Sequence, residues 1–157
     1  MEYKDHHAFK KFSATILNES DQAILVLKGH LFAENIFENL IVLKISRGDK
    51  LLEKASFTFS QKLALVEAME LLDDGLVSSL RALNKLRNKF AHDLDASVSN
   101  NDLLKVGSPL GTVFTKYKRE SAGDDAKLLK KLINYLCGAM GGICYSHEAQ
   151  EIVQNGL

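Results

Sequence analysis

The chain has 157 residues, of which 46% are hydrophobic and 25% are charged, a balance that excludes an intrinsically disordered protein. Its 20 Lys and Arg residues match its 20 Asp and Glu residues, so binding of nucleic acid through overall charge is excluded and would need a local patch. One proline, no tryptophan and few alternating segments predict an all-α, single-domain helical bundle of about five helices over residues 1–157. No leader segment or membrane-length apolar run is apparent, so a cytoplasmic protein without membrane contact is expected.

Two helices are expected in the first third of the chain. Apolar residues at helical spacing predict a first helix from Tyr3 to Asn18, with Asp5 as its N-cap. A longer and more apolar second helix is expected from Gln22 to Ser46, where Arg47-Gly48-Asp49 stops it. Its apolar character predicts that the second helix is the central one of the bundle.

A polar stripe interrupts this second helix. His30, Glu34 and Glu38 follow one another at a spacing of four residues, which places them on one side of a helix. Two interpretations remain open: the stripe is solvated, or Glu34 or Glu38 pairs with Arg87 of a later helix. No further ligand pair lies at metal-binding spacing, so neither a metal nor a cofactor is predicted.

The third and fourth helices are expected to form a hairpin. Thr58 and Gln61 fit a capping box, which predicts a third helix that runs to about Leu72. Asp73-Asp74-Gly75 then leads into a fourth helix from Leu76 to Asp93. Because the connection is so short, the two helices are expected to pack antiparallel.

The fourth helix has two contrasting faces. Five residues form its apolar stripe: Leu76, Leu80, Leu83, Phe90 and Leu94. The far side is cationic and rich in hydrogen-bonding groups: Arg81, Asn84, Lys85, Asn88 and His92. No acidic residue lies between Leu76 and His92 to balance the positive charges, so Arg81, Lys85 and Lys89 are candidate RNA-binding residues. Arg87 projects beside the apolar stripe, where it needs a carboxylate, a phosphate or a partner chain.

Residues 95–121 are expected to be the least regular part of the chain. A basic and aromatic group follows the turn at Gly107-Ser108-Pro109: Lys116, Tyr117, Lys118 and Arg119. Such residues can hold a single RNA strand by stacking and phosphate contact, and an ordinary surface loop is the alternative.

The last helix is expected to start at Asp124 or Asp125. It carries Cys137 and Cys144, which lie too far apart on one helix to form a disulfide and are interpreted as buried thiols. Glycines at 138, 141 and 142 would let another helix approach closely, within the chain or across a dimer.

Three groups near the end of the fourth helix carry the candidate chemistry. Asn88 and His92 share one face, and Arg87 lies about 100° away from Asn88. Imidazole suits proton transfer at neutral pH, guanidinium is a fixed cation for phosphoryl oxygens, and a carboxamide can position either. These are the groups that metal-free RNA cleavage requires. The alternative is that Arg87 is a structural ion-pair partner and that His92 is stabilised by the helix C-terminus.

The segment LNKLRNKFAH, in which Arg87 and His92 close the helix, resembles the Arg-x4-6-His signature of HEPN domains. This resemblance implies an HEPN-like helical bundle, typically homodimeric, which is often a metal-independent endoribonuclease of toxin–antitoxin, abortive-infection or CRISPR systems. Carried over by position, Arg87 and His92 would be the catalytic pair, and Asn88 the polar residue after Arg. RNA and a separately encoded antitoxin or regulatory protein are the implied partners.

The segments SFTFSQKLALVEAMELLDDG and LNKLRNKFAHD are also similar to the mannitol operon repressor group of bacterial regulators. This second resemblance implies a non-catalytic regulatory or protein-interaction domain, which dimerises through the same helix. No helix-turn-helix with a basic recognition helix is apparent, so a protein partner is expected rather than DNA.

Overall fold

The structure is a computed structural model that describes residues 7–156, and this range contains helices and their connections without a strand. The all-α prediction is confirmed, but the described residues form eight α-helices and one 3₁₀ turn instead of about five helices. The elements are α1 (His7–Leu17), α2 (Gln22–Lys44), α3 (Gly48–Ala55), α4 (Phe59–Ala68), α5 (Asp74–His92), α6 (Asn100–Gly107), η2 (Ser108–Leu110), α7 (Thr112–Ser121) and α8 (Asp125–Gln154). The expected helix start at Tyr3 and the expected N-cap Asp5 lie outside the described residues. None of the described helices is long and apolar enough to cross a membrane.

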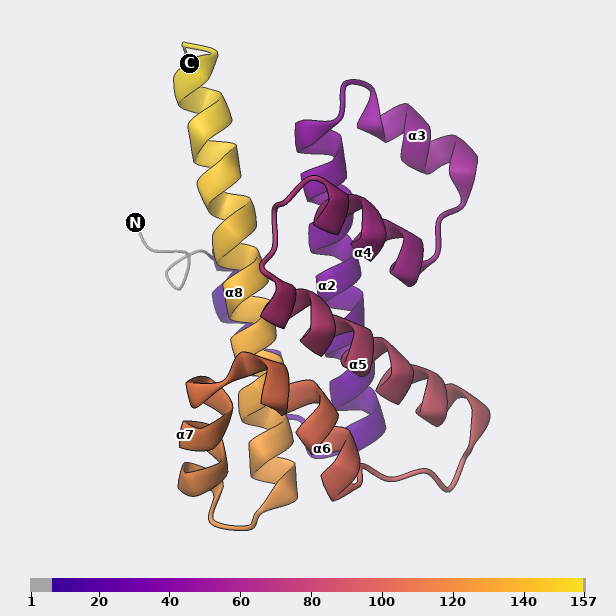
Figure 1. The fold of residues 1–157 in the computed structure, drawn as a ribbon, viewed down its shortest axis with the longest axis vertical. Helices are drawn as coiled ribbons and strands as arrows, with labels where there is room; N and C mark the ends of the chain where they lie inside the picture. The colour runs from indigo at the N-terminus through magenta and orange to yellow at the C-terminus, as the bar shows by residue number, and fades with distance from the viewer. Residues whose placement is uncertain (1–6, 157) are drawn as a thin grey trace.

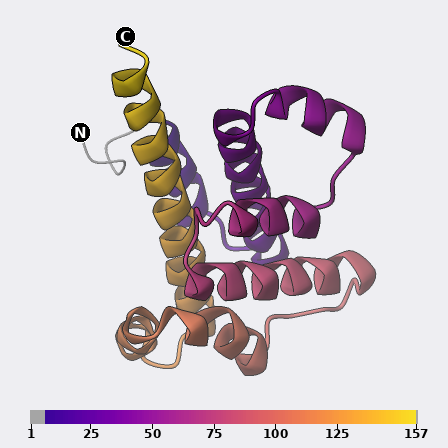
Figure 2. The ribbon, with the colours of Figure 1, turned by 45° about the horizontal axis from the view of Figure 1, so that its top comes forward.

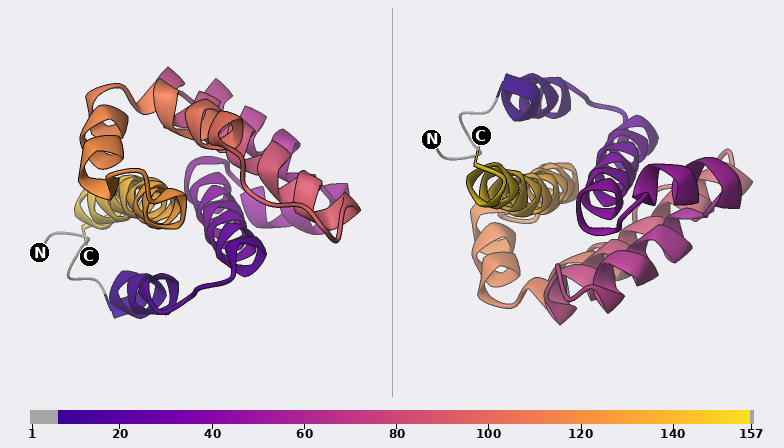
Figure 3. Two further views of the ribbon diagram at one scale, coloured as in Figure 1. Left: turned by 90° about the horizontal axis from the view of Figure 1, so that it is seen from below. Right: turned by 90° about the horizontal axis from the view of Figure 1, so that it is seen from above.

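Helices α2 and α8 form the centre of the molecule and run side by side (Figures 1 and 3). Helix α2 also packs against α3, α4 and α5, which confirms its predicted central position. The approach to α8 is close at Gly29, because a Cβ atom there would lie 2.7 Å from Cγ2 of Ile133. Further along α8, a Cβ atom at Gly138 would lie 3.2 Å from Cζ of Phe9 in α1. Gly138 therefore allows close packing of α1 and α8 within one chain.

Helices α4 and α5 both pack across α2 and run in opposite directions, as the hairpin prediction requires (Figure 2). The predicted capping box starts α4: the Thr58 hydroxyl accepts from N of Gln61 at 3.3 Å, and Oε1 of Gln61 accepts from N of Thr58 at 2.9 Å. Helix α4 ends at Ala68, earlier than predicted. The hairpin thus brings the start of α4 next to the middle of α5.

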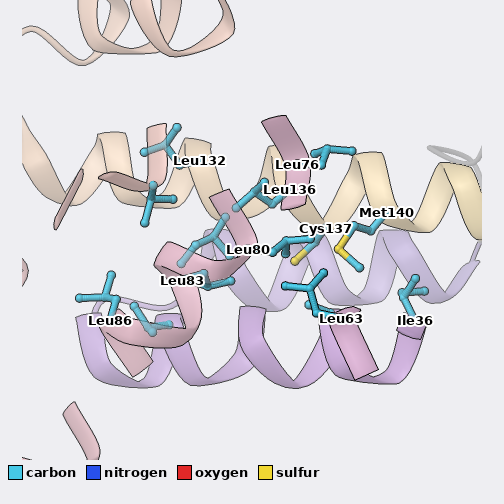
Figure 4. Close-up of a cluster of buried hydrophobic side chains, with 14 of the residues drawn as sticks. Ile36, Leu63, Leu76, Leu80, Leu83, Leu86, Leu132, Leu136, Cys137 and Met140 are labelled. Atoms are coloured by element: carbon cyan, nitrogen blue, oxygen red, sulfur yellow. The ribbon is translucent and has the colours of Figure 1, made fainter. Parts of the chain in front are cut away.

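The core lies where α5 crosses α2 and α8. Figure 4 shows Leu80 and Leu83 of α5 with Leu63 of α4 and Leu136 of α8, and all four side chains are buried. The predicted burial of Cys137 and Cys144 is confirmed, and both are free thiols. Burial raises the pKa of both thiols, that of Cys144 to about 12, so neither is a nucleophile at neutral pH.

The prediction of an irregular segment at 95–121 is wrong, because α6, η2 and α7 occupy most of it. A capping box starts α6: the Ser99 hydroxyl accepts from N of Asp102, and the Asp102 carboxylate accepts from N of Ser99. Helices of eight and ten residues are unstable alone, so these depend on burial of apolar side chains. In α7 the buried side chain is Phe114, whose ring packs directly against Gly107 of α6.

A third unexpected helix, α3, follows α2 after a single sharp turn. Helix α2 ends at Lys44, two residues before the predicted Ser46, and Gly48 and Asp49 of the predicted stop already belong to α3. Arg47 has a left-handed backbone with φ of 64° and is the N-cap of α3. The chain then re-enters a helix at Gly48, whose missing side chain lets it approach the carbonyl group of Ile41. Leu51 and Leu52 pack against the core from α3, so tertiary contact turns this connection into a helix.

Candidate functional site

Helix α5 carries the motif residues and is anchored through its apolar stripe. The prediction is confirmed at three positions, which are buried: Leu76, Leu80 and Leu83. It is wrong at Leu94, because α5 ends at His92 and the side chain beyond it is fully exposed. The last turns of α5 are therefore positioned by the buried leucines that precede them.

The three motif residues differ in their exposure. Arg87 is half-buried, whereas Asn88 and His92 are exposed. Nη1 of Arg87 donates a hydrogen bond to Oδ1 of Asn88 at 3.3 Å. His92 follows Arg87 by five residues, about 7.5 Å along the helix axis, and makes no side-chain hydrogen bond within the described chain. Five residues also turn the helix by about 140°, so His92 lies on another side of α5 than Arg87, whose side chain contacts Asn88.

The interpretation that Glu34 or Glu38 pairs with Arg87 is wrong. Both carboxylates bind Nζ of Lys62, which lies 2.9 Å from Oε1 of Glu34 and 2.6 Å from Oε1 of Glu38. The Lys62 side chain is only 11% exposed, and its two acidic neighbours keep its pKa raised against the effect of burial. Lys62 occupies this position because α4 packs on α2. Within the described residues, Arg87 therefore has no carboxylate partner.

Arg87 instead lines a polar cleft of about 420 Å³ between α2, the start of α4 and α5. We call it the His30 cleft, and its lining is His30, Glu34, Thr58, Phe59, Ser60, Asn84, Arg87 and Asn88. Its size lies in the usual range for sites that bind small molecules or fragments of larger ones. The sequence pattern indicated Asn84 and Asn88 on the polar face of α5, but it did not indicate Ser60. The capping box at Thr58 was the available signal, because it places Ser60 in the first turn of α4.

His30 departs most from its expected environment. It was expected on a solvated stripe, but it is only 5% exposed and its ring stacks on Phe59 with centroids 4.0 Å apart. Nε2 of His30 lies 2.9 Å from Oδ1 of Asn84. Burial is the main cause that lowers the pKa of His30, and the nearby positive charge of Arg87 lowers it further. The imidazole is therefore neutral at neutral pH.

An apolar groove of about 280 Å³ lies on the opposite side of Arg87. It runs between α2 and the end of α5, and its lining includes Ile24, Leu27 and Phe90. The exposed fractions are 43% for Ile24, 41% for Leu27 and 54% for Leu31, which follows Leu27 on the same face of α2. Arg87 thus separates a polar cleft from an exposed apolar surface.

The other candidate RNA-binding residues of α5 have different surroundings. Arg81 pairs with the carboxylate of Glu67, and Lys85 is exposed. Nζ of Lys89 lies 2.8 Å from Oδ2 of Asp102 and also donates to the carbonyl oxygen of Ser97 at 2.8 Å. Lys89 therefore holds the connection between α5 and α6.

The basic and aromatic group lies on α7, away from the motif. Helix α7 packs on α8 beside η2, and η2 contacts the start of α5, whereas the motif lies at the other end of that helix (Figure 1). Lys118 and Arg119 are exposed, and Lys116 lies 3.9 Å from the carboxylate of Glu120. Tyr117 is half-buried and contacts Tyr135 edge to face, with ring centroids 6.1 Å apart. The structure does not bring this group together with Arg87.

Comparison of the chain with protein-family models, with curated proteins and with solved structures found no match. The described residues also contain no group of three His, Cys, Asp or Glu side chains that could hold a metal ion. The His30 cleft offers the Arg87 guanidinium, which has no carboxylate partner among the described residues, two carboxamides, a serine hydroxyl and the buried imidazole of His30. The exposed imidazole of His92 lies at the end of the same helix α5.

Proposed function

We propose that this protein is a metal-independent endoribonuclease of the HEPN type, which acts as a cytoplasmic homodimer. The observation that carries the proposal is the placement of Arg87 at a polar cleft, with no carboxylate partner in the described part of the chain. A guanidinium that only stabilised the fold would be expected to have such a partner. The guanidinium of Arg87 is instead available for phosphoryl oxygens.

In the proposed reaction, the ribose 2′-oxygen attacks the adjacent phosphorus, and the bond from phosphorus to the 5′-oxygen breaks. The products are a 2′,3′-cyclic phosphate and a 5′-hydroxyl group. His92 as a neutral imidazole takes the proton of the 2′-hydroxyl, or as an imidazolium gives a proton to the leaving 5′-oxygen, because histidine side chains take up and release protons near neutral pH. Arg87 stabilises the charge that develops on the phosphoryl oxygens, and Asn88 positions it through the hydrogen bond between them.

The homodimer is proposed because one exposed His92 does not readily serve as both base and acid. The exposed apolar surface of Ile24, Leu27 and Leu31 adjoins Arg87 and provides a face that a second chain could cover. Pairing through this face would place the ends of two α5 helices near each other. A composite site with Arg87, Asn88 and His92 from both chains would result. A separately encoded antitoxin that covers this site is part of the proposal.

His92→Ala is expected to abolish RNA cleavage and leave the fold intact, because His92 is exposed and lies at the end of α5. Total cellular RNA is incubated with the wild-type protein or the variant in the presence of EDTA, and the cleaved ends are analysed. Degradation by the wild type alone, with cyclic phosphate ends, is the expected result. Sedimentation of the same samples reports whether each is a dimer.

Cleavage that persists in His92→Ala, or that EDTA abolishes, overturns the proposal. An inert wild-type protein that still forms a dimer would also overturn it. The motif would then be a structural remnant, and the non-catalytic regulatory function would take its place.

Lys62→Met is expected to lower cleavage about tenfold, although Lys62 does not line the His30 cleft. The substitution releases Glu34, which lines the same cleft as Arg87 and becomes free to pair with its guanidinium. Cleavage rates of Lys62→Met and of the double variant Lys62→Met/Glu34→Gln distinguish this effect from a change in stability. The double variant is expected to recover most of the activity, since the amide cannot neutralise Arg87. Equal rates in both variants would contradict the explanation.

A further inference from the structure

A chain of two hydrogen bonds crosses three helices at the His30 cleft. Nε2 of His30 in α2 lies 2.9 Å from Oδ1 of Asn84 in α5, and Nδ2 of Asn84 donates to Oγ of Ser60 in α4 at 3.1 Å. The three residues are far apart in the sequence, and only the crossing of α2, α4 and α5 brings them together. The chain starts at a buried side chain and ends at an exposed one.

The environment of His30 determines the direction of these hydrogen bonds. Nδ1 of His30 is enclosed and has no hydrogen-bond partner within the described chain. A proton there would be a buried donor without an acceptor, so the single proton of the neutral ring lies on Nε2. Oδ1 of Asn84 accepts it, which turns Nδ2 of Asn84 towards Ser60. The Ser60 oxygen then acts as an acceptor, and its own hydroxyl proton is left to point elsewhere.

The same reasoning applies on the other side of the cleft. Oδ1 of Asn88 accepts the hydrogen bond from Nη1 of Arg87, so the Asn88 amide group has its two N–H bonds free. The remaining N–H bonds of Arg87 have no acceptor among the described residues. Glu34 is the acidic side chain in the lining of the cleft, and Nζ of Lys62 holds its carboxylate at 2.9 Å.

Hydrogen-bond donors therefore dominate the open part of the cleft. The Ser60 hydroxyl, the Asn88 amide and the Arg87 guanidinium come from two helices and line one volume of about 420 Å³. Helix α4 begins at Phe59, so the positive end of its dipole also lies at the cleft. A group that offers several acceptor oxygens and a negative charge matches these donors, and phosphate is such a group.

We infer that the His30 cleft is a phosphate-binding site in which Ser60, Asn88 and Arg87 donate to the phosphate oxygens. His30 is a positioning residue: it does not touch the phosphate, but through Asn84 it makes Ser60 a donor towards the cleft. The phosphate belongs to the backbone of an RNA strand, and this assignment alone rests on the proposed function. The site adds Ser60 and Asn88 to Arg87 as the groups that hold the substrate.

The first experiment measures binding to the ¹⁵N-labelled full chain by NMR. Inorganic phosphate, adenosine 5′-monophosphate, adenosine and a short single-stranded oligoribonucleotide are titrated separately. The three phosphate-containing probes are expected to shift the side-chain amide signals of Asn84 and Asn88 and the Nε–H signal of Arg87, and adenosine is not. Binding of the oligonucleotide at least tenfold tighter than the mononucleotide identifies RNA as the source of the phosphate. Equal binding of adenosine and its monophosphate, or shifts outside these side chains only, overturns the inference.

Variants test the role assigned to His30. Ser60→Ala is expected to weaken phosphate binding several-fold without a change in fold, because Ser60 is exposed. His30→Leu removes the donor to Asn84 and is expected to weaken binding about tenfold, equal to about 1.4 kcal/mol. His30→Gln, whose Nε2 can replace that of the imidazole, is expected to bind within about threefold of the wild type.

A spectroscopic measurement separates positioning from a purely structural role. In the wild type, the ¹⁵N shifts of the His30 ring are expected to show a protonated Nε2 and an unprotonated Nδ1 at pH 7. The opposite tautomer overturns the inference, as does unchanged phosphate binding in Ser60→Ala or in His30→Leu. Phosphate binding without RNA cleavage would refute the proposed nuclease and leave the phosphate site standing. RNA cleavage without phosphate-induced shifts at these side chains would refute the phosphate site and leave the proposed nuclease standing.

Discussion

Arg87→Ala is expected to lower the rate of RNA cleavage about 10³-fold, the usual effect of removing a group that stabilises developing charge. The guanidinium has no carboxylate partner in the described chain, so its removal leaves no unpaired acidic group behind. The free energy of unfolding is therefore expected to change little. Cleavage of total RNA and urea unfolding of the same samples measure the two effects.

Arg87→Lys sharpens this test. Lysine keeps the positive charge but lacks the planar fork that can contact Asn88 and two phosphoryl oxygens together. The rate is expected to fall about 10²-fold, between the wild type and Arg87→Ala. Lys54→Ala is the control, because Lys54 is exposed at the end of α3 and lies outside the cleft. Activity of Arg87→Ala above about a tenth of the wild type would show that Arg87 is not catalytic.

Leu83→Ala is expected to lower the free energy of unfolding by about 3–5 kcal/mol. Leu83 has no exposed surface and lies where α5 meets the central helices, so the smaller side chain leaves a cavity (Figure 4). The midpoint of urea unfolding measures the loss. Leu94→Ala is the matched control, because Leu94 is fully exposed and its removal is expected to cost less than about 0.5 kcal/mol. Similar midpoints for the two variants would contradict the burial of the stripe.

Helical periodicity predicted the parts of the structure that depend on neighbouring residues. The capping box of Thr58 and Gln61 and the burial of Leu76, Leu80 and Leu83 in α5 are local patterns, and both are confirmed. The predicted stop at Arg47-Gly48-Asp49 is wrong, because α2 ends at Lys44 and Gly48 starts α3. The short helices α3, α6 and α7 were not predicted. Helices of this length gain their stability from contacts such as that of Phe114 with Gly107, which local patterns do not contain.

The candidate site also combines features that the sequence predicts with features that only the tertiary structure shows. The sequence indicated that Arg87, Asn88 and His92 lie together near the end of one helix, because their spacing alone places them there. It did not reveal that Lys62 would take both Glu34 and Glu38, although all three residues were visible in the chain. Which of two cations meets a carboxylate depends on how α4 and α5 cross α2.

The sequence by itself determined the all-helical class, the faces of α5 and the position of the Arg87 motif, since each follows from spacing within one helix. Only the tertiary structure decided that Arg87 meets no carboxylate of residues 7–156, that His30 is buried and that Ser60 joins the cleft. The physical reason is that burial and hydrogen bonding between helices depend on packing angles and on competition among side chains. Periodicity gives the side of a helix on which a residue lies, and the fold selects the partner that it meets there.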